Sequence, residues 1–110
     1  MNLIQNDTCL TAMLSGEIDH HTAKEAREQI DAAVHHGHTQ VLRLDFGGVT
    51  FMDSSGVGLI MGRYRLMQGL GGRVEVIHAS PRMEQLMRMA GLGVLNVICS
   101  NTEKRKDDVK

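Results

Sequence analysis

The chain has 110 residues and a formal net charge of -1, so it forms one small domain with no dominant field of either sign. Its 12 basic residues are balanced by 13 acidic ones, which excludes binding to DNA or to an anionic membrane surface as its main function. Two phenylalanines, one tyrosine and no tryptophan exclude an aromatic stacking platform for single-stranded nucleic acid.

The first half of the chain alternates strand and helix patterns. Residues 9–17 alternate apolar and polar side chains and predict a strand, and a short antiparallel edge strand is expected before it at residues 3–4. Thr22 is expected to begin a helix, with Glu25 completing a capping box, and Gly37 fits a left-handed helix end. Two pairs of opposite charges four residues apart are expected on the solvent side of this helix, Lys24 with Glu28 and Arg27 with Asp31.

The second half repeats the alternation. The predicted elements are strands at 41–46 and 49–52 separated by Gly47-Gly48, a helix from about residue 53 to Gly69, a strand at 74–77, a helix that starts at Pro81 and ends at Gly91, and a strand at 94–99. Strands that alternate with helices indicate βαβ crossovers and a largely parallel sheet. The fold class is therefore α/β, with one domain over residues 1–100 and a charged C-terminal tail at residues 101–110.

The sequence also predicts a cytoplasmic protein. The N-terminal segment has neither a basic start nor a long apolar run, so no signal peptide is expected. No stretch approaches the roughly 20 apolar residues that a membrane helix needs. Cys9 and Cys99 stand near opposite ends of a chain with eight methionines, and they are expected to be buried apolar residues in a reducing compartment.

The most informative segment is Phe-Met-Asp-Ser-Ser-Gly-Val-Gly at residues 51–58, which joins a strand end to a helix start. Backbone N–H groups are unpaired at such a position, and the helix dipole favours negative charge there. In the structural interpretation, Asp53 or Ser54 simply caps the helix. In the functional interpretation, a serine at this helix start is exposed for phosphorylation. Gly56 and Gly58 favour the second because each costs roughly 1 kcal/mol in a helix, although tight helix–sheet packing equally explains Gly58 and Gly62.

Other kinds of site have weaker support. A catalytic Ser54 needs Gly-x-Ser-x-Gly, but Met52 stands at the first glycine position and His78 is the only later histidine, so a small serine hydrolase is a remote alternative. No Gly-Lys-Ser/Thr motif occurs, so no nucleotide cofactor is expected. Two histidine groups flank the first helix, His20 and His21 before it and His35, His36 and His38 after it. The helix separates the groups by roughly 20 Å, so they cannot share one metal ion. No metal site is therefore expected, and no other cofactor is expected either.

Two segments resemble a known family. Residues 16–23, Gly-Glu-Ile-Asp-His-His-Thr-Ala, are similar to an element of the sporulation anti-sigma factor antagonists, and residues 51–64 resemble the phosphorylation segment of that family. Matches at Gly71-Gly72, 74–77, Ser80-Pro81 and 89–92 extend the resemblance to roughly residues 3–98. It implies a single STAS domain, in which helices pack on a mixed, mostly parallel sheet of four to five strands.

The resemblance further implies partner switching without catalysis by this chain. In this family the unphosphorylated antagonist binds an anti-sigma factor, itself a serine kinase that carries ATP or ADP, and so frees a sigma factor. The kinase then phosphorylates the antagonist, which dissociates, and a PP2C-type phosphatase restores it. By motif position Ser54 is the phosphorylated residue, and the implied role is regulation of sporulation transcription. An antagonist that serves a stress-response sigma factor is the alternative.

The residues themselves support this mechanism. In a doubly wound sheet the loops at the carboxyl ends of neighbouring strands meet, so a partner-binding surface around Ser54 is expected from Asp19, His20, His21, Asp53, Ser55 and Gly56. A phosphate on Ser54 adds about -1.5 to -2 charge. Its repulsion from Asp53 is of order 3 kcal/mol per charge pair, and its desolvation in an interface adds to that penalty. Both exceed the gain of about 0.3–1 kcal/mol at a helix N-terminus, so the fold should tolerate the phosphate and the partner should reject it.

Overall fold

The computed structural model describes residues 1–99, in which helices pack on one mixed four-stranded sheet. The elements of this range are β1 (Asn2–Asn6), β2 (Cys9–Ile18), α1 (His20–His36), β3 (Val41–Met52), α2 (Ser54–Gly69), β4 (Arg73–Ile77), α3 (Pro81–Met89) and the 3₁₀ helix η1 (Leu92–Leu95). The α/β class and the mixed sheet are thus confirmed. The expected tail at 101–110 lies outside the described residues.

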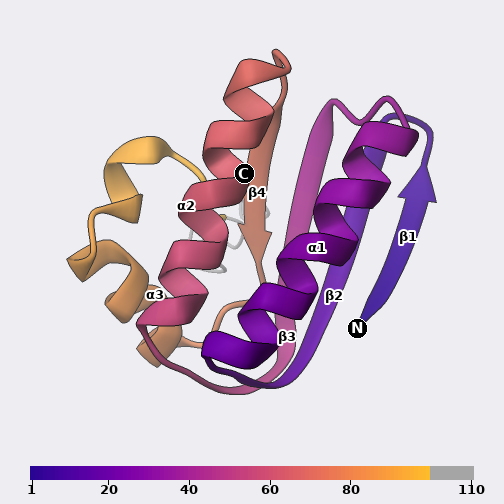
Figure 1. Ribbon diagram of the computed structural model, residues 1–110. Coiled ribbons are helices and arrows are strands. Elements are labelled where there is room, and N and C mark those ends of the chain that lie inside the picture. The colour runs from indigo at the N-terminus through magenta and orange to yellow at the C-terminus, as the bar shows by residue number, and fades with distance from the viewer. Residues whose placement is uncertain (100–110) are drawn as a thin grey trace, which may run out of the picture.

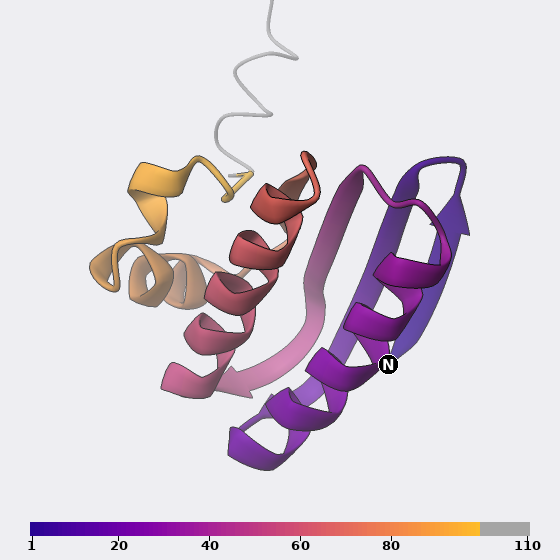
Figure 2. The same ribbon diagram turned by 45° about the horizontal axis from the view of Figure 1, so that its top comes forward.

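The strands lie in the sheet in the same order as along the chain, β1-β2-β3-β4. β1 is antiparallel to β2, while β2, β3 and β4 are mutually parallel. Figure 1 shows α1 and α2 side by side on one face of the sheet, and Figure 2 shows α3 and η1 beyond α2. The expectation of a doubly wound sheet is therefore wrong. Each right-handed crossover moves the chain one strand further in the same direction, so the strand order never reverses.

Helix α1 begins at His20, before the start expected at Thr22. Asp19 is the N-cap, and Thr22 is the third helical residue, which completes a reciprocal capping box with Asp19 in place of Glu25. The prediction failed because aspartate and threonine are both favourable capping residues at this spacing. At the other end Gly37 has a φ of -106°, and it is His38 that adopts the left-handed conformation, with a φ of 51°.

Strand β3 is continuous where two strands were expected, because Gly47 and Gly48 lie within it. Its register against β2 shifts twice, each time with an extra residue in β3, which is the geometry of a β-bulge. The shifts break the two-residue alternation of the strand. Phe46, Val49 and Met52, which are three residues apart, are therefore all buried, while Phe51 is exposed. The bulges therefore explain why the sequence pattern indicated two separate strands.

The strand expected at 94–99 is wrong for most of its length. Helix α3 ends at Met89, two residues before the end expected at Gly91, and Gly91 adopts the left-handed conformation before the chain forms η1. Within the described residues, Ile98 forms a single parallel bridge with Val76. The Val76 N–H donates to the Val97 carbonyl (2.7 Å), and the Cys99 N–H donates to the Val76 carbonyl (2.8 Å). This short pairing covers part of the outer edge of β4.

The core lies between the sheet and the layer formed by α1 and α2. Alternate strand residues and one stripe of each helix meet there, among them Leu10, Leu42, Leu44, Val76, Ile30, Ile60 and Met67. Cys9 is only partly buried and Cys99 is exposed, so the expectation that both belong to the core is wrong. No helix in residues 1–99 has the length and apolar character needed to cross a membrane.

Candidate functional site

The candidate site lies at the edge of the sheet where β2 and β3 end and α1 and α2 begin. The backbone N–H of Asp53 donates to the carbonyl of Ile18 (3.2 Å), which fixes the start of α2 beside the end of β2. Asp19 follows Ile18 directly, so the two helix starts are neighbours. The two helix starts, with Asp19 and Asp53, therefore lie side by side as the sequence predicted. The cause is simpler than a switch in strand order. Two adjacent parallel strands, each followed by a helix, end at the same edge.

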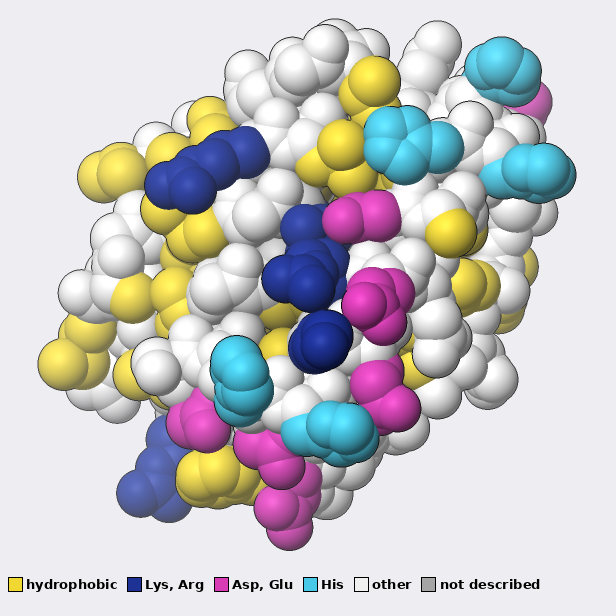
Figure 3. Space-filling model, in the orientation of Figure 1, with side chains coloured by type: hydrophobic (Ala, Val, Ile, Leu, Met, Phe, Trp, Pro, Cys, Tyr) yellow, Lys and Arg dark blue, Asp and Glu magenta, His cyan; other side chains and the backbone are white. Residues whose placement is uncertain are grey.

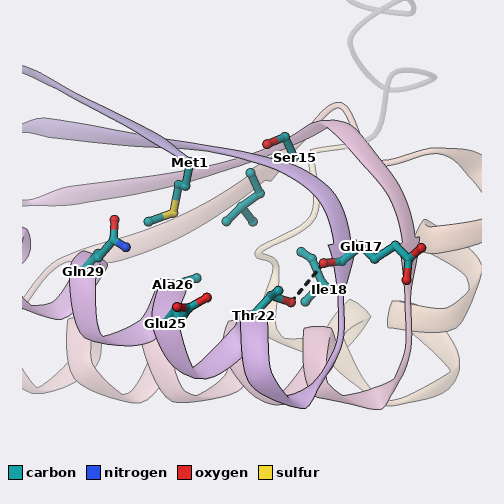
Figure 4. Close-up of a pocket in the computed structure, with 9 residues that line it drawn as sticks. Met1, Ser15, Glu17, Ile18, Thr22, Glu25, Ala26 and Gln29 are labelled. Carbon is teal, nitrogen blue, oxygen red and sulfur yellow. Dashed lines mark hydrogen bonds between the residues drawn. The ribbon is translucent and has the colours of Figure 1, made fainter.

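Asp19 is held as the N-cap of α1 by hydrogen bonds with Thr22. Its Oδ1 accepts from the Thr22 backbone N–H (2.9 Å), and its own N–H donates to the Thr22 hydroxyl oxygen (2.9 Å). The Thr22 hydroxyl donates to the Glu17 carbonyl (2.9 Å), which ties the helix start to the end of β2 (Figure 4). The hydrogen bond from the Thr22 N–H lowers the pKa of Asp19, so an exposed negative charge is fixed at this edge.

Ser54 is the first residue of α2, and it is exposed. Asp53 is the N-cap, because its Oδ1 accepts from the Ser55 backbone N–H (2.7 Å). In the described part of the chain no hydrogen bond engages the Ser54 hydroxyl, whereas Ser55 is partly buried. The Ser54 hydroxyl therefore projects into solvent at a helix N-terminus, next to a carboxylate that already serves the helix.

His20 and His21 are the first two residues of α1 and are both exposed. Nε2 of His21 lies 3.8 Å from Oε1 of Glu25 on the next turn, with 80% of the histidine side chain exposed. In residues 1–99 no group of three or more His, Cys, Asp and Glu side chains is placed to hold a metal ion. These histidines therefore contribute polar, solvent-facing groups to the edge that carries Ser54.

Gly56 has a packing role in place of the surface role expected for it. It is buried, and a Cβ there would lie 2.7 Å from Sδ and 3.2 Å from Cγ of Met52. Its missing side chain thus allows α2 to begin close against the end of β3. Gly58 and Gly62 differ, since a Cβ at either position would meet nothing within 4 Å. Tight packing, the alternative that the sequence left open for these two, does not explain them.

A groove of about 570 Å³ runs between α1 and α2 from the same edge. Its lining residues are His20, Ala23, Lys24, Arg27, Ser55, Gly58, Leu59, Gly62 and Arg63. Figure 3 shows lysine and arginine side chains gathered in a column over the junction of the two helices, with acidic side chains on the α1 side of it. The groove therefore joins a basic surface to the helix start that carries Ser54.

Arg63 is the buried member of that basic group, with 7% of its side chain exposed. Its Nε lies 2.8 Å from Oδ1 of Asp31, but the N–H is not aligned with that oxygen, so the contact is an ion pair without a hydrogen bond. Burial lowers the pKa of Arg63, the Asp31 charge opposes this effect, and the Arg27 charge adds to it. Asp31 therefore pairs with α2, and the expected pair with Arg27 is wrong.

Phe51 also lies in this region, and the sequence pattern indicated no role for it. It is 55% exposed, pairs with Glu17 of β2, and stands three residues before Ser54. Strand alternation could not identify its exposure, because the bulge in β3 changes which face it occupies. An exposed aromatic ring thus lies on the same edge as the serine.

A smaller cavity of about 160 Å³ lies on the opposite side of α1, between that helix, β2 and Met1 (Figure 4). Apolar residues such as Leu14 and Ile18 line it together with the side chains of Glu25 and Gln29. Its few polar groups do not converge on one point in Figure 4, so it is not a second candidate site.

Comparison with known sequences gives relatives over most of the chain. Residues 1–98 match the family model described as Mlab, STAS domain. A Lysinibacillus sphaericus protein named anti-sigma F factor antagonist is 40% identical over 80 residues, which are 73% of this chain and 68% of that protein. A Bacillus subtilis (strain 168) protein named anti-sigma-B factor antagonist is 28% identical over 99 residues, 90% of this chain and 89% of that one.

Solved structures of similar proteins have the same fold. The anti-sigma factor antagonist SpoIIAA in its unphosphorylated form has a TM-score of 0.80 at 31% identity, and the match covers 98% of this chain and 94% of that chain. The Bacillus cell fate determinant SpoIIAA in its phosphorylated form has a TM-score of 0.73 at 32% identity, covering 99% and 98% of the two chains. The chain is thus similar over nearly its full length to structures with and without a phosphate.

Proposed function

This chain belongs to the STAS domain family as an anti-sigma factor antagonist of the SpoIIAA type, and from that premise we propose that its unphosphorylated form binds an anti-sigma factor and so releases a sigma factor. In this proposal the anti-sigma factor is a serine kinase that carries ATP or ADP, and its phosphorylation of Ser54 ends the complex. A PP2C-type phosphatase then restores the free serine. The pathway regulates sporulation transcription, and the chain acts in the cytoplasm without catalysis of its own.

The observation that carries this proposal is the setting of Ser54. Its hydroxyl is exposed, while the carboxylate of Asp53 is engaged by the Ser55 N–H and holds the start of α2 in place. A kinase therefore reaches an acceptor on a rigid, capped helix end. Asp19, His20 and His21 lie on the neighbouring helix start, so they and Ser55 supply contacts around the acceptor.

The charges at this edge explain why a phosphate would end binding. Asp53 and Asp19 are both near the modified serine, and a phosphate adds about -1.5 to -2 charge beside them. In solvent this repulsion is screened, so the fold tolerates it. In an interface the phosphate loses its water, and an unpaired buried charge costs several kcal/mol, which the complex does not recover.

The acceptor is tested by intact-mass spectrometry after incubation with the candidate anti-sigma kinase and ATP. We expect one added phosphate on the natural chain and on a Ser55→Ala control, and none on Ser54→Ala. Phosphate on Ser54→Ala but not on Ser55→Ala would move the acceptor to the second serine. No phosphate on any chain, with an active kinase, would contradict the proposal that the partner is a kinase acting on this chain.

The switch is tested by binding of the same variants to the anti-sigma factor. Ser54→Asp should fold normally and lose binding, because it places a permanent negative charge at the acceptor position. Ser54→Ala should bind and stay bound when ATP is added, since it cannot be modified. Tight binding by Ser54→Asp would contradict the charge argument.

A second candidate role is antagonism in a stress-response pathway, which the similarity to the anti-sigma-B factor antagonist favours. Competition between the anti-sigma-F and anti-sigma-B types of kinase for this chain distinguishes the two roles. We expect preference for the sporulation type, in line with the higher identity of 40% to the anti-sigma F antagonist.

A reactive-serine probe should leave Ser54 unlabelled, and labelling would favour the remote alternative of a serine hydrolase.

A further inference from the structure

The groove between α1 and α2 is kept open by two glycines that the fold does not require. Gly58 and Gly62 stand one turn apart on α2 and line the groove, and a Cβ at either would meet nothing within 4 Å. Glycine inside a helix costs roughly 1 kcal/mol relative to alanine. Alanine at both positions would thus stabilise α2, and its methyl groups would take up space in the groove.

The groove also has an excess of positive charge. Lys24, Arg27 and Arg63 line it, and among the described lining residues none is a carboxylate. Arg63 is paired with Asp31, whereas neither Lys24 nor Arg27 is in an ion pair within residues 1–99. Two cations that form no ion pair with a carboxylate therefore line the groove beside the two glycines.

The groove is continuous with the edge that carries the acceptor serine. Ser55 and His20 line its end, and Ser54 is the residue before Ser55 at the first turn of α2. An anion bound along the groove would therefore have a phosphate on Ser54 as its neighbour. The two charges would repel each other and would compete for the same cations.

We propose that this groove receives an acidic segment of the anti-sigma factor, with its carboxylates against Lys24 and Arg27 and its backbone close to Gly58 and Gly62. This inference rests on the proposed function. It adds which part of the anti-sigma factor, an acidic segment, the phosphate would displace. Opposite charges favour the docked segment while Ser54 is free. Once Ser54 is modified, the phosphate repels the same carboxylates. This repulsion in the groove then favours release of the partner, in addition to the repulsion between the phosphate and Asp53.

The glycine floor gives a test in which stability and binding move in opposite directions. Gly62→Ala should raise the urea midpoint of unfolding and lower the affinity for the anti-sigma factor by about tenfold, since the methyl group fills space that the segment needs. Gly69→Ala is the matched control, because it lies in the same helix, has nothing within 4 Å of its Cβ, and is not part of the groove. It should raise the midpoint and leave the affinity unchanged.

The charges give an independent test. The double variant Lys24→Gln with Arg27→Gln should lose about tenfold or more in affinity at low salt, and its binding should depend less on salt than that of the natural chain. Arg65→Gln is the control, since Arg65 is an exposed cation of α2 that does not line the groove. It should bind like the natural chain at every salt concentration.

The outcomes separate the two proposals. If the natural chain binds, Ser54→Asp does not, and both Gly62→Ala and the double variant bind normally, the groove is not the docking site and the phosphorylation switch stands. If the double variant and Arg65→Gln are weakened to the same extent while Gly62→Ala binds normally, the effect is one of general charge and the groove proposal fails. If the natural chain does not bind the anti-sigma factor at all, both proposals fail.

Discussion

Asp19 and Asp53 occupy the same structural position, the N-cap of a helix that follows a parallel strand, and the two strands that they follow are adjacent. Each carboxylate accepts a backbone N–H from the first turn of its helix, from Thr22 in one case and from Ser55 in the other. The helix ends are therefore rigid, and the negative charges there are fixed in place. Ser54 follows one such group directly and lies on the helix start beside the other, so it has a defined electrostatic setting before any partner arrives.

The lowered pKa of Asp19 makes part of the stability depend on pH. A carboxyl group whose pKa is lower in the folded chain stabilises the fold fully above its ordinary pKa of 3.8, and this contribution is lost as the pH falls through the lowered value. We therefore expect Asp19→Asn to show a flatter decline in urea midpoint than the natural chain between about pH 5 and pH 2. Parallel declines for the two chains would contradict the assignment.

Asp53 has separable roles as a cap and as a charge. Asp53→Ala should lower the free energy of unfolding by about 1 kcal/mol, the usual effect of removing a capping side chain. Asp53→Ser retains a capping oxygen, so it should preserve stability while removing the charge beside Ser54. Urea unfolding of the three chains measures the first effect. Phosphorylated Asp53→Ser should retain more binding to the anti-sigma factor than the phosphorylated natural chain does.

At the scale of elements, the end of β3 and the start of α2 depend on each other. The β-bulges turn Met52 inward, and Gly56 provides the space that the Met52 side chain occupies. The same bulges turn Phe51 outward onto the edge of the site. One irregular strand end thus sets both the helix position and the exposed surface around Ser54.

Gly56→Ala tests this coupling. Its Cβ would lie 2.7 Å from the Met52 sulfur, so the side chain or the helix must shift, and we expect a loss of about 1–2 kcal/mol in the free energy of unfolding. Gly69→Ala in the same helix should instead gain stability. A Gly56→Ala chain as stable as the natural one would show that Met52 moves aside without cost, and would contradict the role assigned to this glycine.

At the scale of the whole molecule, the ion pair between Asp31 and Arg63 joins α1 to α2. Arg63 is buried, and Arg27 adds repulsion to the cost of burying its charge. Arg63 therefore depends on Asp31 for compensation. Both helices pack on one face of the sheet, so this contact holds together the two elements that line the groove.

Removal of Asp31 should therefore be costly. Asp31→Ala leaves a buried guanidinium without its carboxylate, and we expect a loss of about 2–3 kcal/mol, reduced from the usual range because 32% of the Asp31 side chain is exposed. Adding Arg63→Met should recover part of that loss, since an apolar side chain of similar length needs no counterion. Urea unfolding of the two single variants and the double variant measures the coupling, and additive effects would contradict it.

Local patterns were enough to predict most elements of this chain. Alternation located β2 and β4, helical spacing located α1 and α2, and Pro81 and Gly91 bounded α3, because these signals depend on residues close in sequence. The α/β class followed from the same alternation, and the setting of Ser54 followed from its place between a strand and a helix. The helix start expected at Thr22 was wrong, since Asp19 and Thr22 satisfy the same local capping rule and Asp19 is the cap.

Tertiary structure decided what depends on the pairing of distant segments. The bulges in β3 exist only against β2, so neither the continuity of that strand nor the exposure of Phe51 was readable from its own residues. The strand order, and with it the placing of both helices on one face, brought Arg63 to Asp31 and formed the groove. The sequence by itself determined an exposed serine on a small α/β domain, because capping and periodicity are local. The surface around that serine required the packed chain, because its parts come from helices that meet only when the sheet has formed.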